Sequence, residues 1–145
     1  MKEVVGTNMW DIKADAYCIT TNGIVKGNGR AVMGAGVALS AVNKFQQCDK
    51  HLGDFIAKNG HVVGVFYVVD SGDLISFPTK YHWRDKSYIE LIEKSAKELA
   101  ELVSKNRYQT VILPRPGCAN GGLNWEDVKK VIAPILDNRV TVVSL

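Results

Sequence analysis

Apolar residues follow two alternating patterns along this chain: short runs rich in β-branched residues, and longer stretches with spacings of three and four residues. The first pattern predicts strands and the second predicts amphipathic helices. The predicted strands are residues 2–5, 16–20, 62–69, 74–77, 110–113 and 140–144. The predicted helices are residues 34–45, 48–59, 87–106 and 125–136.

Residues at the segment ends support these elements. Ser87, with Glu90 three residues later, has the pattern of a capping box, and Asn124 is placed to cap the last helix. Residues 70–73 predict a turn that makes the two strands around it a hairpin. Because helices alternate with strands, the expected fold is a three-layer α/β/α domain with a mixed, mostly parallel six-stranded sheet.

Composition narrows the class of protein. The 145 residues suit one domain, and 46% hydrophobic residues provide for a core. The net charge of +3 permits a nucleic-acid partner without arguing for one. Three cysteines without paired spacing predict reduced thiols in a cytoplasmic protein, with no disulfide framework, metal site or cofactor. No apolar run reaches the roughly 20 residues that span a membrane, so no membrane partner is expected.

Two glycine-rich loops precede helices and carry the first candidate chemistry. The first, residues 27–39, contains four glycines, and the second is residues 114–124. Glycine allows close approach of a ligand, and free N–H groups at a helix start favour anions. Two such loops predict a ligand with a diphosphate, such as a nucleotide sugar. The first loop does not have the spacing of a dinucleotide fingerprint or a P-loop.

Each loop also has a simpler reading. The first could be a flexible connector, although small residues leading directly into a helix favour a ribose and phosphate pocket made by Gly34, Ala35, Gly36 and Val37. The second could be a tight turn, although it is longer than a turn needs. Its candidate ligand contacts are Pro116, Gly117, Cys118, Ala119, Asn120, Gly121 and Gly122. Cys118 is either a nucleophile or, more simply, a small residue that fits the turn.

A third stretch, residues 77–86, follows a predicted strand and should lie on the same edge of the sheet. Lys80 is either a solvated charge or a partly buried nucleophile or anion contact. His82 is either a surface residue or a catalyst, and Trp83 either packs on the core or stacks on a base. Asp11, placed at the end of a strand, is a turn residue or the acceptor of a purine amine. Asn22 binds ribose hydroxyls or forms an Asx turn.

These motifs together resemble the macrodomain family, the ADP-ribose-binding fold. The resemblance covers nearly the whole chain, from Trp10-Asp-Ile through Ile-Thr-Thr-Asn22 and Met33-Gly-Ala-Gly-Val-Ala to Gly-Gly-Leu-Asn-Trp125. Its most specific part is Phe77-Pro-Thr-Lys-Tyr-His-Trp-Arg-Asp-Lys-Ser87. That part is similar to the branch of terminal ADP-ribose glycohydrolase and the bacterial DNA ADP-ribosyl glycohydrolase antitoxins.

The resemblance implies roles for single residues. Asp11 would bind the adenine amine with help from the Ile12 backbone, and Asn22 would face the distal ribose. The first loop would wrap the distal ribose and phosphate, and the second would close on the diphosphate. Lys80 would be the catalytic lysine, since an amine forms a Schiff base with an opened ribose. Thr79, His82 and Trp83 would add substrate contacts, with Arg84 helping to hold a modified strand.

Two departures qualify this picture. Gly121 stands where the terminal glycohydrolase has an aspartate, which favours the antitoxin branch as the guide. Residues 25–30 lengthen the first loop and bring cationic side chains near the distal pocket. The leading hypothesis is a stand-alone, monomeric hydrolase, residues 1–145, that removes ADP-ribose from a DNA base, with single-stranded DNA as a partner. The alternatives are an ADP-ribose-1''-phosphate phosphatase, an O-acetyl-ADP-ribose deacetylase, and a non-catalytic reader of ADP-ribose.

Overall fold

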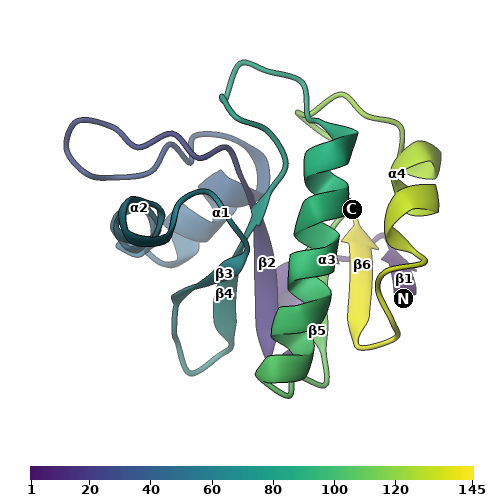
Figure 1. Ribbon diagram of the computed structural model, residues 1–145. Helices are drawn as coiled ribbons and strands as arrows, with labels where there is room; N and C mark the ends of the chain where they lie inside the picture. The colour runs from purple at the N-terminus through teal and green to yellow at the C-terminus, as the bar shows by residue number, and fades with distance from the viewer.

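A computed structural model describes all residues, 1–145, and shows one sheet with helices on both faces (Figure 1). The strands are β1 (Lys2–Val5), β2 (Ala16–Thr21), β3 (Gly64–Tyr67), β4 (Asp73–Pro78), β5 (Val111–Pro114) and β6 (Val140–Ser144). The helices are α1 (Gly36–Lys44), α2 (Cys48–Asn59), α3 (Ile89–Lys105) and α4 (Trp125–Ile132), with a short 3-10 turn, η1 (Met9–Asp11). None of the helices has the length and apolar character needed to cross a membrane.

The sheet has the strand order β1-β6-β5-β2-β4-β3. Every neighbouring pair is parallel except β3 and β4, which form the predicted antiparallel hairpin. The expected mixed, mostly parallel six-stranded sheet is therefore confirmed. Strand β2 lies between β4 and β5, so the segments that follow these three strands leave the sheet side by side.

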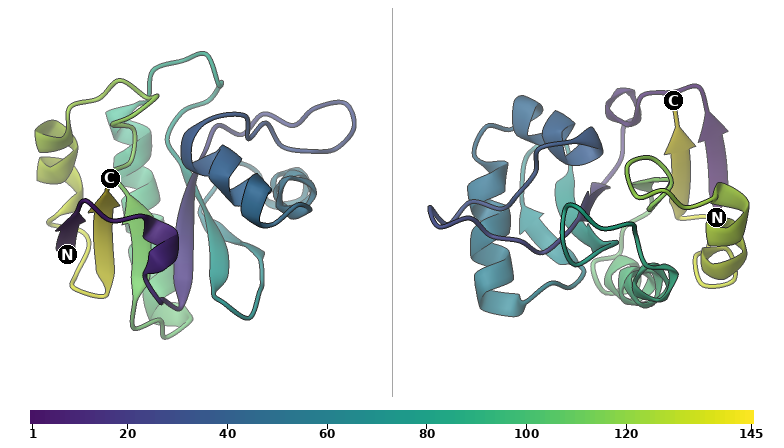
Figure 2. Two further views of the ribbon diagram at one scale, coloured as in Figure 1. Left: turned by 180° about the vertical axis from the view of Figure 1, so that it is seen from behind. Right: turned by 90° about the horizontal axis from the view of Figure 1, so that it is seen from above.

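Both faces of the sheet are buried, and the alternation of side chains along β2 shows how. Ala16 and Cys18 pack with α3 and α4, whereas Tyr17 and Ile19 pack with α1 and α2. Seen from above in Figure 2, the two helix pairs lie on opposite sides of the sheet. A strand buried on both faces reads as an almost continuous apolar run, which is the pattern of residues 16–20.

Several element ends follow local signals. Helix α2 has the predicted bounds and stops at Gly60, whose φ of +83° suits glycine. Helix α4 begins as predicted, because the Asn124 side chain accepts from the Glu126 N–H at 2.8 Å. It ends at Ile132 rather than at residue 136, because Pro134 has no N–H to donate to a carbonyl of the preceding turn.

Other ends depart from the prediction. Helix α1 begins at Gly36, because Ala35 is extended. Helix α3 begins at Ile89 without a side-chain cap, so the predicted capping box at Ser87 is wrong. Asp11 does not end a strand; it is the last residue of η1, which the Asn8 side chain caps by accepting from the Trp10 N–H at 3.0 Å.

The residues inserted in the first loop form a small hairpin, with a bridge between Val25 and Ala31. Arg30 pairs with Asp49 of α2 at 2.8 Å and also donates to Gln47. The hairpin extends away from the sheet at one side of Figure 1. The expectation that its cationic side chains lie near the ligand pocket is therefore wrong for Arg30, whose charge is used to hold the hairpin on α2.

Candidate functional site

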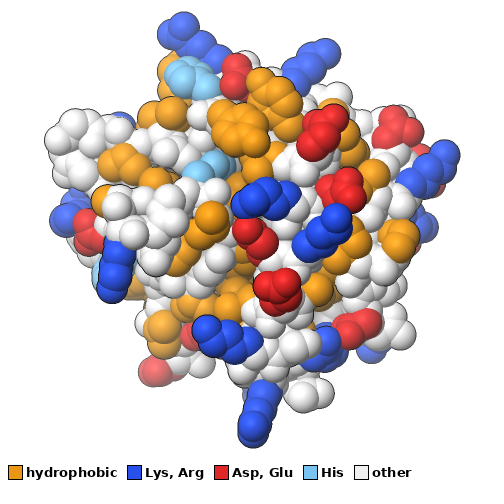
Figure 3. All heavy atoms as spheres, in the orientation of Figure 1, with side chains coloured by type: hydrophobic (Ala, Val, Ile, Leu, Met, Phe, Trp, Pro, Cys, Tyr) orange, Lys and Arg blue, Asp and Glu red, His pale blue; other side chains and the backbone are white.

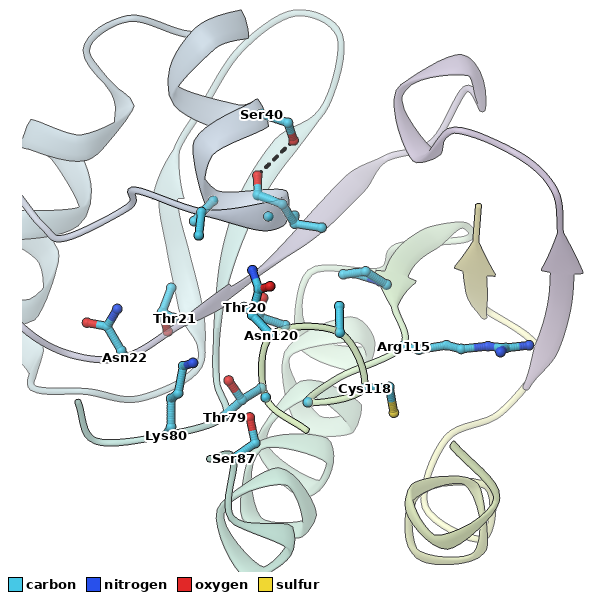
Figure 4. A pocket seen from close by; sticks show the side chains of 18 of the residues that line it. Thr20, Thr21, Asn22, Ser40, Thr79, Lys80, Ser87, Arg115, Cys118 and Asn120 are labelled. Carbon is cyan, nitrogen blue, oxygen red and sulfur yellow. Dashed lines mark hydrogen bonds between the residues drawn. The ribbon is translucent and has the colours of Figure 1, made fainter. Parts of the chain in front are cut away.

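A cavity of about 890 Å³ lies at the carboxyl ends of the central strands. In an open α/β sheet this is where ligands bind. The segments after β2, β4 and β5 supply most of the lining, and Figure 4 shows part of it. Thirteen of the residues predicted for the site line the cavity: Asn22, Gly34, Ala35, Gly36, Val37, Thr79, Lys80, Trp83, Gly117, Cys118, Ala119, Asn120 and Gly121.

The first glycine loop presents the N-terminus of α1 to the cavity. No side chain caps this helix start, and its first turn has no acidic residue. The N–H groups of Gly36, Val37 and Ala38 have no acceptor in the protein. They form an array that favours an anion. The two glycine loops meet here, since a Cβ on Gly36 would lie 3.1 Å from the Asn120 amide nitrogen.

The second loop offers a similar set of donors. The N–H groups of Cys118, Gly122 and Leu123 are used within the loop, the last donating to the Gly117 carbonyl at 2.8 Å. Between them, the N–H groups of Ala119, Asn120 and Gly121 have no acceptor in the protein. Consecutive free N–H groups in a turn bind anions. The two loops thus place two sets of free donors on one cavity, as a diphosphate requires.

Lys80 lies in the segment between β4 and α3. Its ammonium donates to the carbonyls of Trp83 at 3.4 Å and Asp85 at 3.3 Å, and it forms no ion pair. In Figure 4 this ammonium points toward the space between Asn22 and Asn120. The amine is therefore held by neutral carbonyls alone at the cavity, where a substrate can meet it.

The segment that carries Lys80 is tied to the rest of the site at both ends. At its start, the Thr79 N–H donates to the Thr21 carbonyl at 3.1 Å. At its end, the Tyr88 N–H donates to the Thr79 carbonyl and the Ser87 N–H to the Gly121 carbonyl, each at 2.9 Å. These bonds fix Lys80 relative to both glycine loops.

Ser87 occupies the place that a side chain at residue 121 would need. A Cβ on Gly121 would overlap the Ser87 hydroxyl and lie 2.6 Å from the Gly117 carbonyl oxygen. An aspartate at this position therefore cannot be accommodated without moving the second loop. Ser87 is 7% exposed and lines the cavity, so the serine predicted as a helix cap is part of the site.

Asn22 has both polar atoms of its amide occupied. Its oxygen accepts from the Ile24 N–H at 2.9 Å, as in an Asx turn, and its nitrogen donates to the Val32 carbonyl at 3.2 Å. The side chain thus closes the base of the first loop while also lining the cavity. The turn interpretation is confirmed, and contact with ribose stays a prediction.

Cys118 lines the cavity but does not have the setting of a nucleophile. Burial raises the pKa of its thiol, which donates to the Pro116 carbonyl at 3.5 Å. Reactive thiols have lowered pKa values instead. In Figure 4 the sulfur points away from Lys80. The interpretation of Cys118 as a small residue that fits the loop is the one the structure supports.

Five predicted site residues lie outside this cavity. Asp11 and Ile12 line a separate pocket of about 630 Å³, which shares Trp10 with the main one. His82, Pro116 and Gly122 line neither. His82 is half-buried and stacks on Trp83 at a ring distance of 5.1 Å. The structure does not place these five residues in the main cavity, and their contacts with substrate stay predictions.

A buried polar chain behind the cavity was not anticipated from the sequence. The Thr21 hydroxyl bonds to His61 Nε2 at 2.9 Å and to the Ser76 hydroxyl at 3.0 Å. Burial lowers the pKa of His61 to about 4, so the ring is neutral at pH 7. The His61 ring also packs against Gly23, where a Cβ would lie 2.7 Å from it. His61 thus supports the turn that carries Asn22.

The Macro domain family model matches residues 27–132. The chain belongs to the macrodomain family. A curated relative from Thermus aquaticus, described as DNA ADP-ribosyl glycohydrolase, is 31% identical over 143 residues, covering 94% of this chain. This macrodomain spans only 38% of the length of that relative.

Solved structures agree with this assignment. The macrodomain of Thermus aquaticus DarG matches with a TM-score of 0.80 and 29% identity, covering 99% of this chain and 97% of that one. Thermosipho africanus DarTG, solved in complex with ADP-ribose, matches with a TM-score of 0.76 and 19% identity. The latter match covers 98% of this chain and 41% of that protein. At that identity it bears on the fold alone.

Proposed function

We propose that this macrodomain is a hydrolase that releases ADP-ribose from a modified DNA base of thymidine type, with Lys80 as the catalytic amine. The observation that carries the proposal is the position of the Lys80 ammonium, at a cavity with two sets of free N–H donors and without a carboxylate partner. The similarity to the Thermus aquaticus relative, which is described as a DNA ADP-ribosyl glycohydrolase, supports it.

In this proposal the donor arrays determine how the ligand lies. The diphosphate lies between the start of α1 and residues 119–121, because both present unpaired N–H groups. The distal ribose then meets Lys80 and the base of the first loop. Asp11 and Ile12, in the adjoining pocket beyond Trp10, remain the predicted contacts of the adenine.

The reaction breaks the bond between the base and the distal ribose carbon C1''. The ribose ring opens as its ring oxygen takes a proton from the Lys80 ammonium. The resulting amine adds to C1'' and the base leaves with a second proton from the Lys80 nitrogen, which leaves a protonated Schiff base. Water then adds to C1'', the amine leaves and the ring closes. One water is consumed, and free ADP-ribose and the unmodified base are released.

The test compares the wild type with Lys80→Ala on single-stranded DNA that carries an ADP-ribosylated thymidine. We expect Lys80→Ala to lose turnover by at least about 100-fold while ADP-ribose affinity, measured by calorimetry, changes little. Lys58→Ala, an exposed lysine at the end of α2, is the matched control. Cyanoborohydride should trap substrate covalently on Lys80 in the wild type, as mass spectrometry would detect.

Each alternative predicts a different result. Equal turnover by wild type and Lys80→Ala would refute the lysine mechanism. Turnover of ADP-ribose-1''-phosphate or O-acetyl-ADP-ribose, with none on DNA, would indicate a small-molecule hydrolase. Binding of ADP-ribose with no turnover of any substrate would indicate a reader.

A further inference from the structure

The exposed aromatic side chains of this protein are concentrated in one place. Tyr81, Trp83 and Tyr88 are 58%, 47% and 43% exposed, and no other Trp, Tyr or Phe is comparably open to solvent. All three belong to the segment that carries Lys80. Exposed apolar rings gathered beside a cavity mark an interaction surface.

These rings form an ordered group with a histidine and an arginine as neighbours. Trp83 stacks on His82, with 30° between the ring planes, and the Arg84 guanidinium lies 4.7 Å from the Trp83 ring centroid. Tyr81 and Tyr88 pair at a ring distance of 5.2 Å. We call this group, Tyr81, His82, Trp83, Arg84 and Tyr88, the aromatic rim.

The rim is joined directly to the reacting amine. The Trp83 carbonyl accepts from Lys80, the Asp85 N–H donates to the His82 carbonyl at 3.0 Å, and the Arg84 N–H donates to the His82 ring at 3.1 Å. Trp83 and Arg84 also line the cavity. Whatever lies on the rim therefore lies at the mouth of the cavity and beside Lys80.

The net positive charge of this segment favours binding of a polyanion. Residues 80–88 contain three cationic side chains, Lys80, Arg84 and Lys86, and one carboxylate, Asp85. Figure 3 shows cationic and histidine side chains beside hydrophobic ones at the upper edge of the molecule. Aromatic rings beside cationic side chains are the means by which proteins hold unpaired bases and their phosphates.

We infer that the aromatic rim binds single-stranded DNA on either side of the modified nucleotide. Bases stack on Trp83 and on the Tyr81–Tyr88 pair, and Arg84 and Lys86 meet the backbone phosphates. A duplex hides the faces of its bases, so the rim selects unpaired strands. This inference rests on the proposed function for the modified base, and it assigns the recognition of the surrounding strand.

The experiment compares two substrates, the ADP-ribosylated nucleoside alone and the same nucleoside within a single strand of about ten nucleotides. Tyr81 and Tyr88 lie outside the cavity. The double variant Tyr81→Ala/Tyr88→Ala should therefore raise KM for the oligonucleotide at least about fivefold and leave the nucleoside reaction unchanged. Val68→Ala, which removes a side chain 75% exposed at the hairpin turn, is the control.

Two further sets of variants test separately whether bases stack on Trp83 and whether Arg84 contacts a phosphate. Trp83→Phe should retain most oligonucleotide affinity that Trp83→Ala loses, because phenylalanine still stacks. Arg84→Gln should reduce the salt dependence of binding by about 0.7 in log–log slope, the value for one phosphate contact of a single strand. Binding of unmodified strand, followed by fluorescence anisotropy, reports on the rim even if the protein hydrolyses nothing.

The outcomes are distinguishable. If the wild type turns over neither substrate but the rim variants weaken strand binding, the proposed function fails and the rim assignment stands. If the rim variants leave oligonucleotide binding and KM unchanged, or if duplex and single-stranded substrates react equally, the rim assignment is overturned. If the aromatic rim binds a protein partner instead, the rim variants would leave oligonucleotide binding and KM unchanged.

Discussion

Substitution of Gly121 tests how closely the second loop is packed around the site. In Gly121→Ala the new methyl group would overlap the Ser87 hydroxyl and lie 2.6 Å from the Gly117 carbonyl oxygen and 2.8 Å from the Gly117 Cα. Carbon atoms in favourable contact are about 3.5–4.0 Å apart. The backbone of the loop must therefore move, and the Ser87 N–H bond to the Gly121 carbonyl is weakened as it does.

The expected cost follows from these contacts. Overpacking costs about 1–3 kcal/mol, and a lost hydrogen bond costs about 1 kcal/mol. The free energy of unfolding should fall by about 3 kcal/mol, which lowers Tm by about 6–12 °C for a chain of this size. Because residues 119–121 carry the free N–H groups, ADP-ribose affinity should fall at least about tenfold.

Urea unfolding followed by circular dichroism measures the first effect, and calorimetry with ADP-ribose measures the second. Gly27→Ala is the control, since a Cβ there meets no atom within 4 Å and φ is not positive; it should change stability by less than about 1 kcal/mol. Ser87→Ala combined with Gly121→Ala should recover part of the loss, because one of the overlapping atoms is gone. A Gly121→Ala protein with wild-type stability and affinity would show that the packing argument is mistaken.

Three further predictions concern residues outside the cavity. The folded-state pKa of His61, about 4, lies below its ordinary 6.5, so the unfolded chain takes up a proton first. Stability should therefore fall by about 2 kcal/mol, discounted for partial exposure, as pH drops from 6.5 to 4, and His61→Gln should remove this component in pH-dependent urea unfolding. Gly53→Ala should cost at least about 2 kcal/mol in the same assay, because a Cβ there would overlap the Gly29 carbonyl oxygen. Arg30→Ala should lower the free energy of unfolding by no more than about 1 kcal/mol and leave ADP-ribose affinity in calorimetry unchanged, since the partner of Arg30 is Asp49. A large loss of affinity would instead show that the hairpin contributes to the ligand site.

The sequence predicted those elements whose signals are local. Helix α2 and strands β1 and β6 have the predicted bounds. The signals that mark them, Gly60 and the short apolar runs, each lie within a few residues of sequence. Ser87 shows the limit of this reading. A serine three residues before a glutamate has the pattern of a capping box, but its N–H bonds to Gly121, which is distant in sequence. No neighbouring residue could have revealed that contact.

The same distinction between local signals and long-range contacts applies to the residues of the candidate site. The glycine loops were singled out because glycines before a predicted helix are visible in the sequence, whereas the catalytic role of Lys80 was implied only by the family resemblance. Thr21 and His61 were missed because their bond joins residues 40 positions apart, and an isolated histidine after a helix stop has no distinctive pattern. Arg30 was misjudged because proximity in sequence to the first loop did not reveal its pairing with α2.

The positions of the charged groups separate binding from reaction in this macrodomain. In the proposed function, the two glycine loops contribute backbone N–H groups, which would bind a diphosphate but cannot form or break bonds at a ribose carbon. The segment between β4 and α3 supplies both Lys80 and Asp85, which is the only acidic side chain in the cavity lining. Since residue 121 has no room for a side chain, an aspartate cannot be added from the second loop. Changes in the loops should therefore act mainly on affinity for ADP-ribose, whereas changes in the Lys80 segment should act on turnover and on the choice of what ADP-ribose is attached to.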